Sequence, residues 1–162
     1  AGLNAICSLL SYSLPERDPH PKLYDRTINL FDFLTNGSDW PLIYLRWELM
    51  LLEDMGFGLD LTKCAVTNKT EDLAYISPKS GRAVSKTAAG IWANKLLTFP
   101  KCLKGEVELI AEDLAIGFDV TGYFLKNWLA PQINGKPLPD SRARLLETLE
   151  GYLSSSTSTY NY

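Results

Sequence analysis

The segment 44–84 constrains the fold more than any other part of the chain. It opens within a helix that is apolar nearly all round: leucines share one face of the helical projection, and isoleucine, tryptophan and methionine side chains cover most of the remainder. A helix of this kind packs against other elements on several sides. The sequence therefore predicts a buried helix that is capped by Ser38 or Asp39 and closed by Gly56.

Two further helices precede the buried one. The first shows apolar helical spacing from Leu3 onward and ends at the connector 15–21, because each proline there pushes its predecessor toward extended geometry. The second begins at Pro21 and ends at a left-handed Asn36-Gly37 stop. The first residues already have helical spacing, without an initiating methionine or a capping sequence, so we expect a helix entered from a missing upstream domain.

Helical spacing returns in the last third of the chain. It runs over 105–130, with Gly117 and Gly122 as points where the helix kinks or divides, and Pro131 is predicted to end it. A last helix opens at 139–141, and its apolar residues fit a one-face pattern closely.

Between Gly58 and Gly90 the apolar period changes from that of helices to that of strands. Two short strands, 73–76 and 82–85, are joined by the turn-forming sequence Ser-Pro-Lys-Ser-Gly. The predicted fold is therefore mainly α, a helical bundle with a small inserted β-hairpin module that resembles a zinc ribbon. Its parts are a first helical region (1–57), the insertion (58–90), a second helical region (91–153) and a disordered tail (154–162) that has neither periodicity nor aliphatic side chains.

Composition fits one core of domain size with an appended module, since 46% of the 162 residues are hydrophobic and 22% are charged. The cysteines Cys7, Cys64 and Cys102 are odd in number and far apart, which excludes a disulfide framework and favours a reducing, cytoplasmic setting. No apolar run approaches the ~20 residues that span a bilayer, and no signal peptide is recognisable. We expect a soluble protein with no membrane partner.

Charge is distributed unevenly along the chain. The net charge of −3 conceals a segment, 79–104, with six basic residues and no acidic one. Such a surface attracts phosphates or an acidic peptide, and Trp92 and Phe99 within it are suited to stacking on bases or receiving an apolar anchor. The alternative is that the lysines solvate an exposed loop and the two aromatic residues belong to the core. The six basic residues are Lys79, Arg82, Lys86, Lys95, Lys101 and Lys104.

Cys64 occupies the first position of a ribbon-type zinc site, which needs two Cys-x-x-Cys pairs to complete a tetrahedral shell. The partner position is Thr67, and the second pair falls near Ser85 and Ala88, whose hydroxyl and methyl groups do not hold zinc. We therefore expect no metal and no other cofactor, and we interpret Cys64 as a small apolar filler without a metal or redox role. Packing and hydrogen bonds must then replace the contribution of the metal. The residues expected to supply that packing are Leu59, Leu61, Val66, Leu73 and Tyr75.

Three other polar residues have structural as well as functional interpretations. Arg46 lies between two apolar faces of the buried helix and almost in line with Glu53, which favours a structural ion pair or hydrogen-bonding role over a place on the rim of a binding pocket. Asp60 is expected to cap or brace the insertion. His20 lies between two prolines with no Ser or Cys motif nearby, and we do not expect it to act as a catalytic base.

The runs LRWELMLLEDMGFGLDLTKCAV, DLAYISPKSGRAVS, TGYFLKNWL and SRARLLETL follow the order and spacing of one family. From about Leu3 to Leu153 the chain resembles the RecO family of DNA repair proteins, in the form without zinc cysteines seen in some alphaproteobacteria. RecO proteins begin with an oligonucleotide-binding barrel (OB-fold), which we do not expect to find among these 162 residues. The resemblance is therefore to the C-terminal helical region alone.

The resemblance implies a non-enzymatic recombination mediator that acts after DNA damage in the RecF pathway of DNA repair, in the cytoplasm at the nucleoid. Such a protein binds single- and double-stranded DNA, engages the acidic C-terminal tail of single-stranded DNA-binding protein, anneals strands and, with RecR, helps to load RecA. A tail that is acidic and ends in an apolar residue needs a hydrophobic pocket rimmed by Arg or Lys. The predicted rim residues are Arg82, Lys86, Lys95 and Lys101, followed by Lys79, Lys104, Arg46 and Lys126.

Two functions of other classes remain open. One is a purely structural protein-interaction scaffold with no DNA affinity of its own, which weak and salt-insensitive DNA binding would indicate. The other is an enzyme, against which stand the single histidine and the lack of a Gly-rich phosphate loop. A nuclease needs convergent carboxylates and a divalent ion, whereas Glu106, Glu108, Glu112 and Asp113 are spaced as a solvated helix face.

Overall fold

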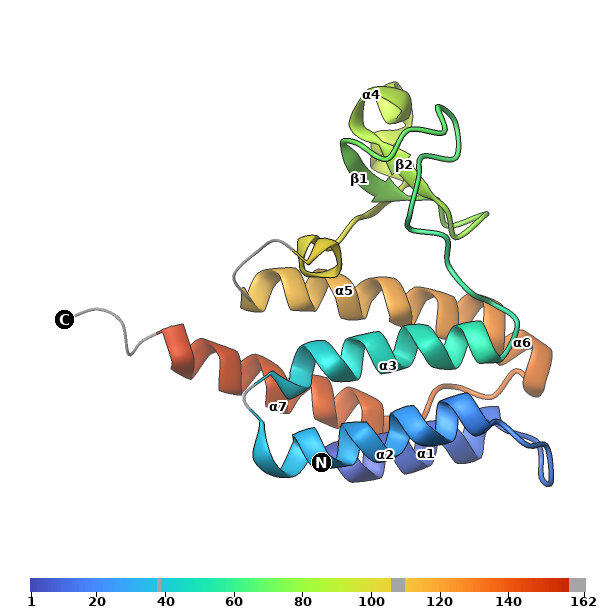
Figure 1. Ribbon diagram of the computed structural model, residues 1–162, viewed down its shortest axis with the longest axis vertical. Coiled ribbons are helices and arrows are strands. Elements are labelled where there is room, and N and C mark those ends of the chain that lie inside the picture. Colours follow the sequence, from blue (N-terminus) through green and yellow to red (C-terminus); the bar gives the residue numbers. More distant parts are fainter. Residues whose placement is uncertain (38, 106–109, 158–162) are drawn as a thin grey trace.

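The computed structural model describes residues 1–37, 39–105 and 110–157, and the side chains of the last helix as far as Gly151. Five helices form a closed ring in which each contacts the next and the last contacts the first: α1 (Gly2–Ser13), α2 (Pro21–Asn36), α3 (Trp40–Asp54), α5 (Ala111–Phe124) and α7 (Asp140–Thr157). Figure 1 shows α1 and α2 at the base of this bundle and α5 at its top. The prediction of a mainly helical fold is confirmed.

The first three helices follow their predicted limits closely. Pro21 opens α2 at its first turn, where a missing N–H costs little. The predicted left-handed stop at Gly37 is wrong, because this residue is extended (φ −121°, ψ 144°) and its N–H donates to the carbonyl oxygen of Phe33. Gly56 follows the end of α3 with a φ of +88°. Ser38, one of the two predicted caps, lies outside the described residues.

α3 packs on two sides, as its apolar sequence predicts. Toward α2, the indole Nε1 of Trp47 donates to Thr27 Oγ1 at 2.9 Å. Toward α5, the ring of Tyr44 lies 5.8 Å from that of Phe118, and it also stacks on Trp47 at 5.8 Å. Tyr44 and Trp47 are almost wholly buried. This helix therefore joins the base of the bundle to its top.

The glycines of α5 serve packing, not bending. The helix runs without a break through Gly117 and Gly122, so the predicted kinks at these residues are wrong. A Cβ atom at Gly117 would lie only 2.4 Å from Cδ2 of Leu45 in α3, and one at Gly122 would lie 3.2 Å from a guanidinium nitrogen of Arg142. Both glycines let a neighbouring side chain approach the helix backbone closely.

The predicted helix end at Pro131 is also wrong. After α5 the helix widens into a π turn, η3 (Leu125–Leu129), and continues past the proline as α6 (Ala130–Ile133). Proline has no N–H to donate to the residue four positions earlier. In the π turn directly before Pro131, the backbone hydrogen bonds span five positions and not four, since Ala130 N–H donates to the carbonyl of Leu125.

The last helix is longer than predicted. α7 extends to Thr157 and so takes in the first four residues of the segment expected to be disordered. Helix ends are the least certain part of any sequence-based assignment, and serine has only a modest helix penalty. Residues 106–109, which the prediction placed in a helix, and residues 158–162 lie outside the described residues. Within the described ranges, no helix is both long and apolar enough to cross a bilayer.

Residues 58–104, here called the ribbon module, contain an antiparallel sheet of order β2-β1-β3. Strands β1 (Leu73–Ile76) and β2 (Ala83–Ser85) correspond to the predicted hairpin, and β3 (Leu97–Thr98) adds a third strand beyond residue 90. The short helices are α4 (Lys86–Ala89), η1 (Gly90–Lys95) and η2 (Lys101–Lys104). Figure 1 shows the ribbon module standing on the α5 side of the bundle.

Two of the contacts between the ribbon module and the bundle involve single, well-defined residues. In the hairpin turn, Gly81 (φ +67°) lies so close to Trp128 of the π turn that a Cβ atom would be 3.2 Å from the indole ring. Beneath η2, the carboxylate of Asp113 in α5 accepts the backbone N–H of Lys101 at 2.6 Å and that of Cys102. The module is therefore held to the bundle at two separate points.

Candidate partner-binding surface

The positions that correspond to zinc ligands come together inside the ribbon module. Ser85 N–H donates to the sulfur of Cys64 at 3.3 Å, and the Ser85 hydroxyl lies 3.5 Å from the same sulfur. Thr67 contributes hydrogen bonds to this thiol from its side chain and its backbone. Ala88 N–H donates to Ser85 Oγ at 3.3 Å. The four positions thus keep a common centre, with hydrogen bonds joining them.

Cys64 is buried, as predicted, but it is more than an apolar filler. Burial raises the pKa of its thiol, and the hydrogen bonds from Thr67 and Ser85 together outweigh that effect and lower the pKa to about 6. The sulfur is therefore a hydrogen-bond acceptor at the centre of the ribbon.

This set of residues does not fit zinc, because one thiol, two hydroxyls and a methyl group supply a single good ligand. Across residues 1–37, 39–105 and 110–157, no three His, Cys, Asp or Glu side chains are grouped as a metal site. Among the residues expected to pack the module, Leu73 is buried, and Leu59, Leu61 and Tyr75 are partly buried against the core. Val66 was wrongly included, since it is 71% exposed.

Three of the six basic residues lie toward the hairpin-turn end of the sheet. Lys79 is in the turn, Arg82 directly precedes β2, and Lys95 precedes β3, which enters the sheet opposite Ile76. Arg82 already has a partner, because its Nε lies 3.9 Å from Oδ2 of Asp60 and the two residues also form a parallel backbone bridge. Asp60 therefore braces the ribbon module, as expected.

The other three basic residues lie toward the opposite end of the sheet. Lys86 opens α4, and Lys101 and Lys104 belong to η2, which follows β3. Lys104 turns inward and donates its ammonium group to the carbonyl oxygen of Leu73. Four positions along an extended chain separate Arg82 from Lys86, which is roughly 13 Å. The predicted rim residues thus form two groups and do not surround one point.

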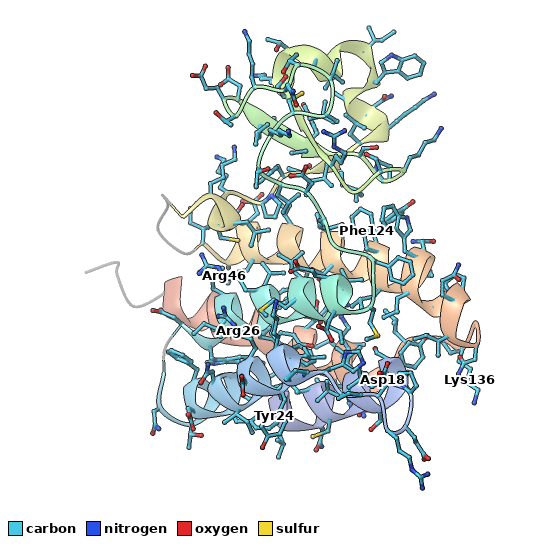
Figure 2. The ribbon with its side chains drawn as sticks, turned by 45° about the vertical axis from the view of Figure 1, so that its right-hand side comes forward. Asp18, Tyr24, Arg26, Arg46, Phe124 and Lys136 are labelled. Atoms are coloured by element: carbon cyan, nitrogen blue, oxygen red, sulfur yellow. The ribbon has the colours of Figure 1, made fainter. Side chains whose placement is uncertain are left out.

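Arg46 is exposed on α3 near the second of these groups. Burial and the neighbouring Asp113 raise the pKa of Cys102 in η2 to about 12, and the positive charge of Arg46 acts in the opposite direction. Figure 2 shows Arg46 at the end of the bundle that lies beneath η2. The predicted ion pair with Glu53 is wrong: both side chains are described and exposed, and no ion pair joins them.

Lys126 and His20 lie away from the ribbon module. Lys126 is exposed on the π turn, two positions before Trp128, and so projects from roughly the opposite side of the helix. His20 links the connector to the end of α3, since Nε2 lies 3.3 Å from Asp18 Oδ2 and Nδ1 contacts Asp54 Oδ2. Neither residue is brought together with the basic groups of the module.

The two aromatic residues of the basic segment differ in exposure. Phe99 is only 5% exposed and lies under the ammonium group of Lys104, whose Nζ is 5.0 Å from the ring centroid. Trp92 is 57% exposed, and Lys95 Nζ lies 4.8 Å from the centroid of its ring. Phe99 is therefore a core residue, while Trp92 is available to a partner.

A buried ion pair between α3 and α7 was not predicted. Arg142 Nε lies 2.8 Å from Glu48 Oε1, and a terminal guanidinium nitrogen donates to Oε2 at 3.0 Å. Thr121 of α5 donates to the same carboxylate at 2.5 Å, and Arg142 also donates to the carbonyl of Phe118 at 3.1 Å. Burial raises the pKa of the adjacent Tyr44, and the negative charge of Glu48 raises it further. This network joins three helices and is closed to solvent.

The four carboxylates weighed as a nuclease site do not act as one group. Glu106 and Glu108 lie outside the described residues. Glu112 is exposed on the first turn of α5, as expected of a solvated face. Asp113 is instead engaged by the backbone of η2, so for this residue the prediction of a solvated position is wrong.

Charge separates the ribbon module from the rest of the protein. Residues 58–104 contain eight basic and three acidic residues, a net charge of +5, which leaves −8 for the remaining residues. Fold and surface together define a class of protein: an acidic helical bundle that carries a basic ribbon, in which hydrogen bonds join the positions that correspond to zinc ligands.

Comparison with known proteins identifies the family. The family model described as "Recombination protein O C terminal" matches residues 1–137. Proteins named DNA repair protein RecO are similar over 92% of this chain: that of Cereibacter sphaeroides is 54% identical over 149 residues, that of Ruegeria sp. is 52% identical over 151, and that of Paracoccus denitrificans is 52% identical over 149. The chain belongs to the RecO family, which confirms the resemblance seen in its sequence.

The chain spans about three fifths of the length of these relatives, with 62% of the Cereibacter and Ruegeria proteins and 60% of the Paracoccus protein covered. No solved structure matches the chain significantly.

Proposed function

We propose that this chain serves in DNA repair as the helical, partner-binding part of a recombination mediator. The observation that carries the proposal is the family match over residues 1–137, supported by relatives of more than 50% identity that are named DNA repair proteins. In this proposal the protein is not an enzyme. It acts in the cytoplasm at the nucleoid, where it binds single- and double-stranded DNA and RecR, promotes strand annealing and assists RecA loading.

The acidic tail of single-stranded DNA-binding protein is the partner whose chemistry best suits the second basic group. An acidic peptide that ends in an apolar residue needs a hollow beside a cation. A hollow of this kind opens next to Lys104, and Lys86 and Lys101 are exposed at the same end of the sheet. Glu71 and Asp72 also line the hollow, and the backbone N–H of Lys86 donates to the carbonyl of Asp72, so the peptide meets carboxylates as well as lysines there. Its apolar lining consists of Leu61, Leu73, Phe99 and Leu103.

Isothermal titration calorimetry with a short acidic peptide of this kind tests the proposal. We expect micromolar binding that weakens as salt rises. The double variant Lys86→Glu/Lys101→Glu should bind roughly tenfold more weakly, because two exposed cations become anions. Arg82 is left unchanged because its pairing with Asp60 has a structural role.

The matched control is Lys22→Glu/Arg26→Glu, which makes the same charge change on the exposed surface of α2. This control should leave the affinity unchanged. Equal affinity of the folded Lys86/Lys101 variant and the wild-type chain, or an equal loss in the control, would move the peptide site elsewhere.

A structural scaffold is the second candidate function. It is favoured by the engagement of Arg82 with Asp60 and of Lys104 with Leu73, which leaves fewer free cations on the ribbon module than the sequence indicates. A folded chain that binds neither the acidic peptide nor DNA at low salt would support this function and refute the mediator surface.

We also propose that the ribbon module binds no zinc, because Cys64 is the one thiolate among its four ligand positions. Elemental analysis of protein purified from zinc-supplemented medium should find far less than one equivalent. A full equivalent of zinc, lost on chelation together with structure, would contradict the proposal.

A further inference from the structure

Ile91 and Trp92 form an exposed apolar tip on the ribbon module, beside Lys95. Ile91 is 86% exposed and Trp92 is 57% exposed. Gly90, with a φ of +49°, joins α4 to η1 in a conformation that other residues rarely adopt. Ala93 on the same turn packs against the core. The element therefore presents one side to the module and its two largest side chains to solvent.

Lys95 is placed over the Trp92 ring, with 4.8 Å between its Nζ and the ring centroid. A cation over an indole face is favourable and limits the motion of both side chains. The exposed remainder of the indole is open to a second planar partner. The arrangement thus combines a stacking surface with a positive charge directly beside it.

The electrostatic surroundings of the tip select for a polyanion. No Asp or Glu occurs between residues 73 and 105, and the ribbon module as a whole carries a net charge of +5. Both side chains of the tip are largely exposed, so the indole of Trp92 offers a face to stack on. Bases of a single strand expose such faces, whereas a duplex hides them within its stack.

We propose that this tip binds single-stranded DNA, with a base stacked on Trp92, Ile91 packed at its edge and Lys95 in contact with a neighbouring phosphate. The inference rests on the proposed function of the chain as a DNA-binding mediator and adds the place at which a base is held. Base stacking on aromatic side chains tolerates any sequence, so the site serves sequence-independent binding.

The test compares binding of fluorescein-labelled oligo(dT), and of an abasic strand of equal length, to the 162-residue chain by fluorescence anisotropy at low salt. Trp92→Ala should weaken oligo(dT) binding roughly 5- to 150-fold, which corresponds to the loss of one stacked base, and should leave binding of the abasic strand unchanged. Trp92→Phe keeps a ring and should retain most of the affinity. Lys95→Gln should reduce the slope of log affinity against log salt concentration by the amount expected for the loss of about one phosphate contact.

Tyr24→Ala provides the matched control, because Tyr24 is an aromatic residue of 66% exposure on α2. Figure 2 shows it on the side of the bundle away from the ribbon module. This variant should bind oligo(dT) as the wild-type chain does.

Unchanged oligo(dT) affinity of a folded Trp92→Ala variant, or equal binding of oligo(dT) and the abasic strand to the wild-type chain, overturns the inference. The inference is also overturned if Trp92→Ala loses binding of the acidic peptide but keeps binding of DNA, since the tip would then be a protein-binding site. If the wild-type chain binds the acidic peptide but not oligo(dT), the tip inference fails and the mediator function stands. If it binds neither, both fail.

Discussion

Replacing Arg142 with methionine should lower the free energy of unfolding by about 3–5 kcal/mol, because the Glu48 carboxylate stays buried without a countercharge. Glu48 is fully buried, and its oxygens lie 2.8 and 3.0 Å from guanidinium nitrogens. At 2.8 Å the attraction is about 6 kcal/mol with an effective dielectric constant of about 20, and desolvation of the two ions offsets much of it. Thr121 remains as a donor, and one hydrogen bond does not replace the charge. The expected loss is a large fraction of the about 5–15 kcal/mol that stabilises a typical domain.

Urea unfolding followed by far-ultraviolet circular dichroism measures this effect. Arg144→Met is the control, since Arg144 is exposed on the same helix and should change stability by no more than about 0.5 kcal/mol. The double variant Glu48→Leu/Arg142→Met removes both charges and should recover most of the loss. The reasoning is refuted by a loss below about 1 kcal/mol in Arg142→Met, or by a double variant as unstable as the sum of its single variants.

Two further predictions concern helix packing and the thiol at the centre of the ribbon module. Gly117→Ala should lower the free energy of unfolding by about 1–3 kcal/mol, because its Cβ would lie 2.4 Å from Leu45 Cδ2. Gly151→Ala, at a position with open space around it on α7, should raise the free energy of unfolding by up to about 1 kcal/mol. Thermal unfolding measures both variants, and similar melting temperatures would contradict the close approach at Gly117. The folded pKa of Cys64, about 6, lies below its ordinary value of 9.0, so its stabilisation is complete above pH 9.0 and is lost as the pH falls through about 6. Urea titrations at both ends of this range should show a weaker pH dependence for Cys64→Ala than for the wild type, and identical dependence would mean that the fold does not favour the thiolate.

Local signals were sufficient for most elements of the fold. Proline at the start of α2, glycine after α3 and the turn sequence of the hairpin act over a few residues, and each was found in the predicted place. The same kind of signal gave a wrong prediction of a kink at Gly117. The low helix propensity of glycine indicates a weak point in a helix only where tertiary packing does not require a glycine. At this position the close contact with Leu45 requires glycine, and that contact depends on how α3 crosses α5.

The Glu48–Arg142 pair shows which contacts cannot be predicted from a single sequence. Glu48 is four positions from Tyr44 and from Leu52, so a helical projection places its charge among buried residues. That charge signals a buried partner, but the partner lies 94 positions further along the chain. The predicted pair, Arg46 with Glu53, is seven residues apart, roughly 10 Å along the helix axis, which is too far for direct contact.

If the ribbon module binds no zinc, as proposed above, other contacts have to supply the stability that a zinc ribbon obtains from its metal. Structural zinc contributes roughly 10–16 kcal/mol to a small finger, whereas each hydrogen bond around Cys64 is worth about 0.5–1.5 kcal/mol. Two contacts with the bundle add to these hydrogen bonds: Gly81 packs on Trp128, and Asp113 holds the backbone of η2. Trp128 is itself held edge-on by Phe124, with 4.7 Å between ring centroids. These contacts place the ribbon module on α5 and η3, so we expect substitutions at Trp128 or Asp113 to alter the orientation of the basic surface even though neither residue belongs to it.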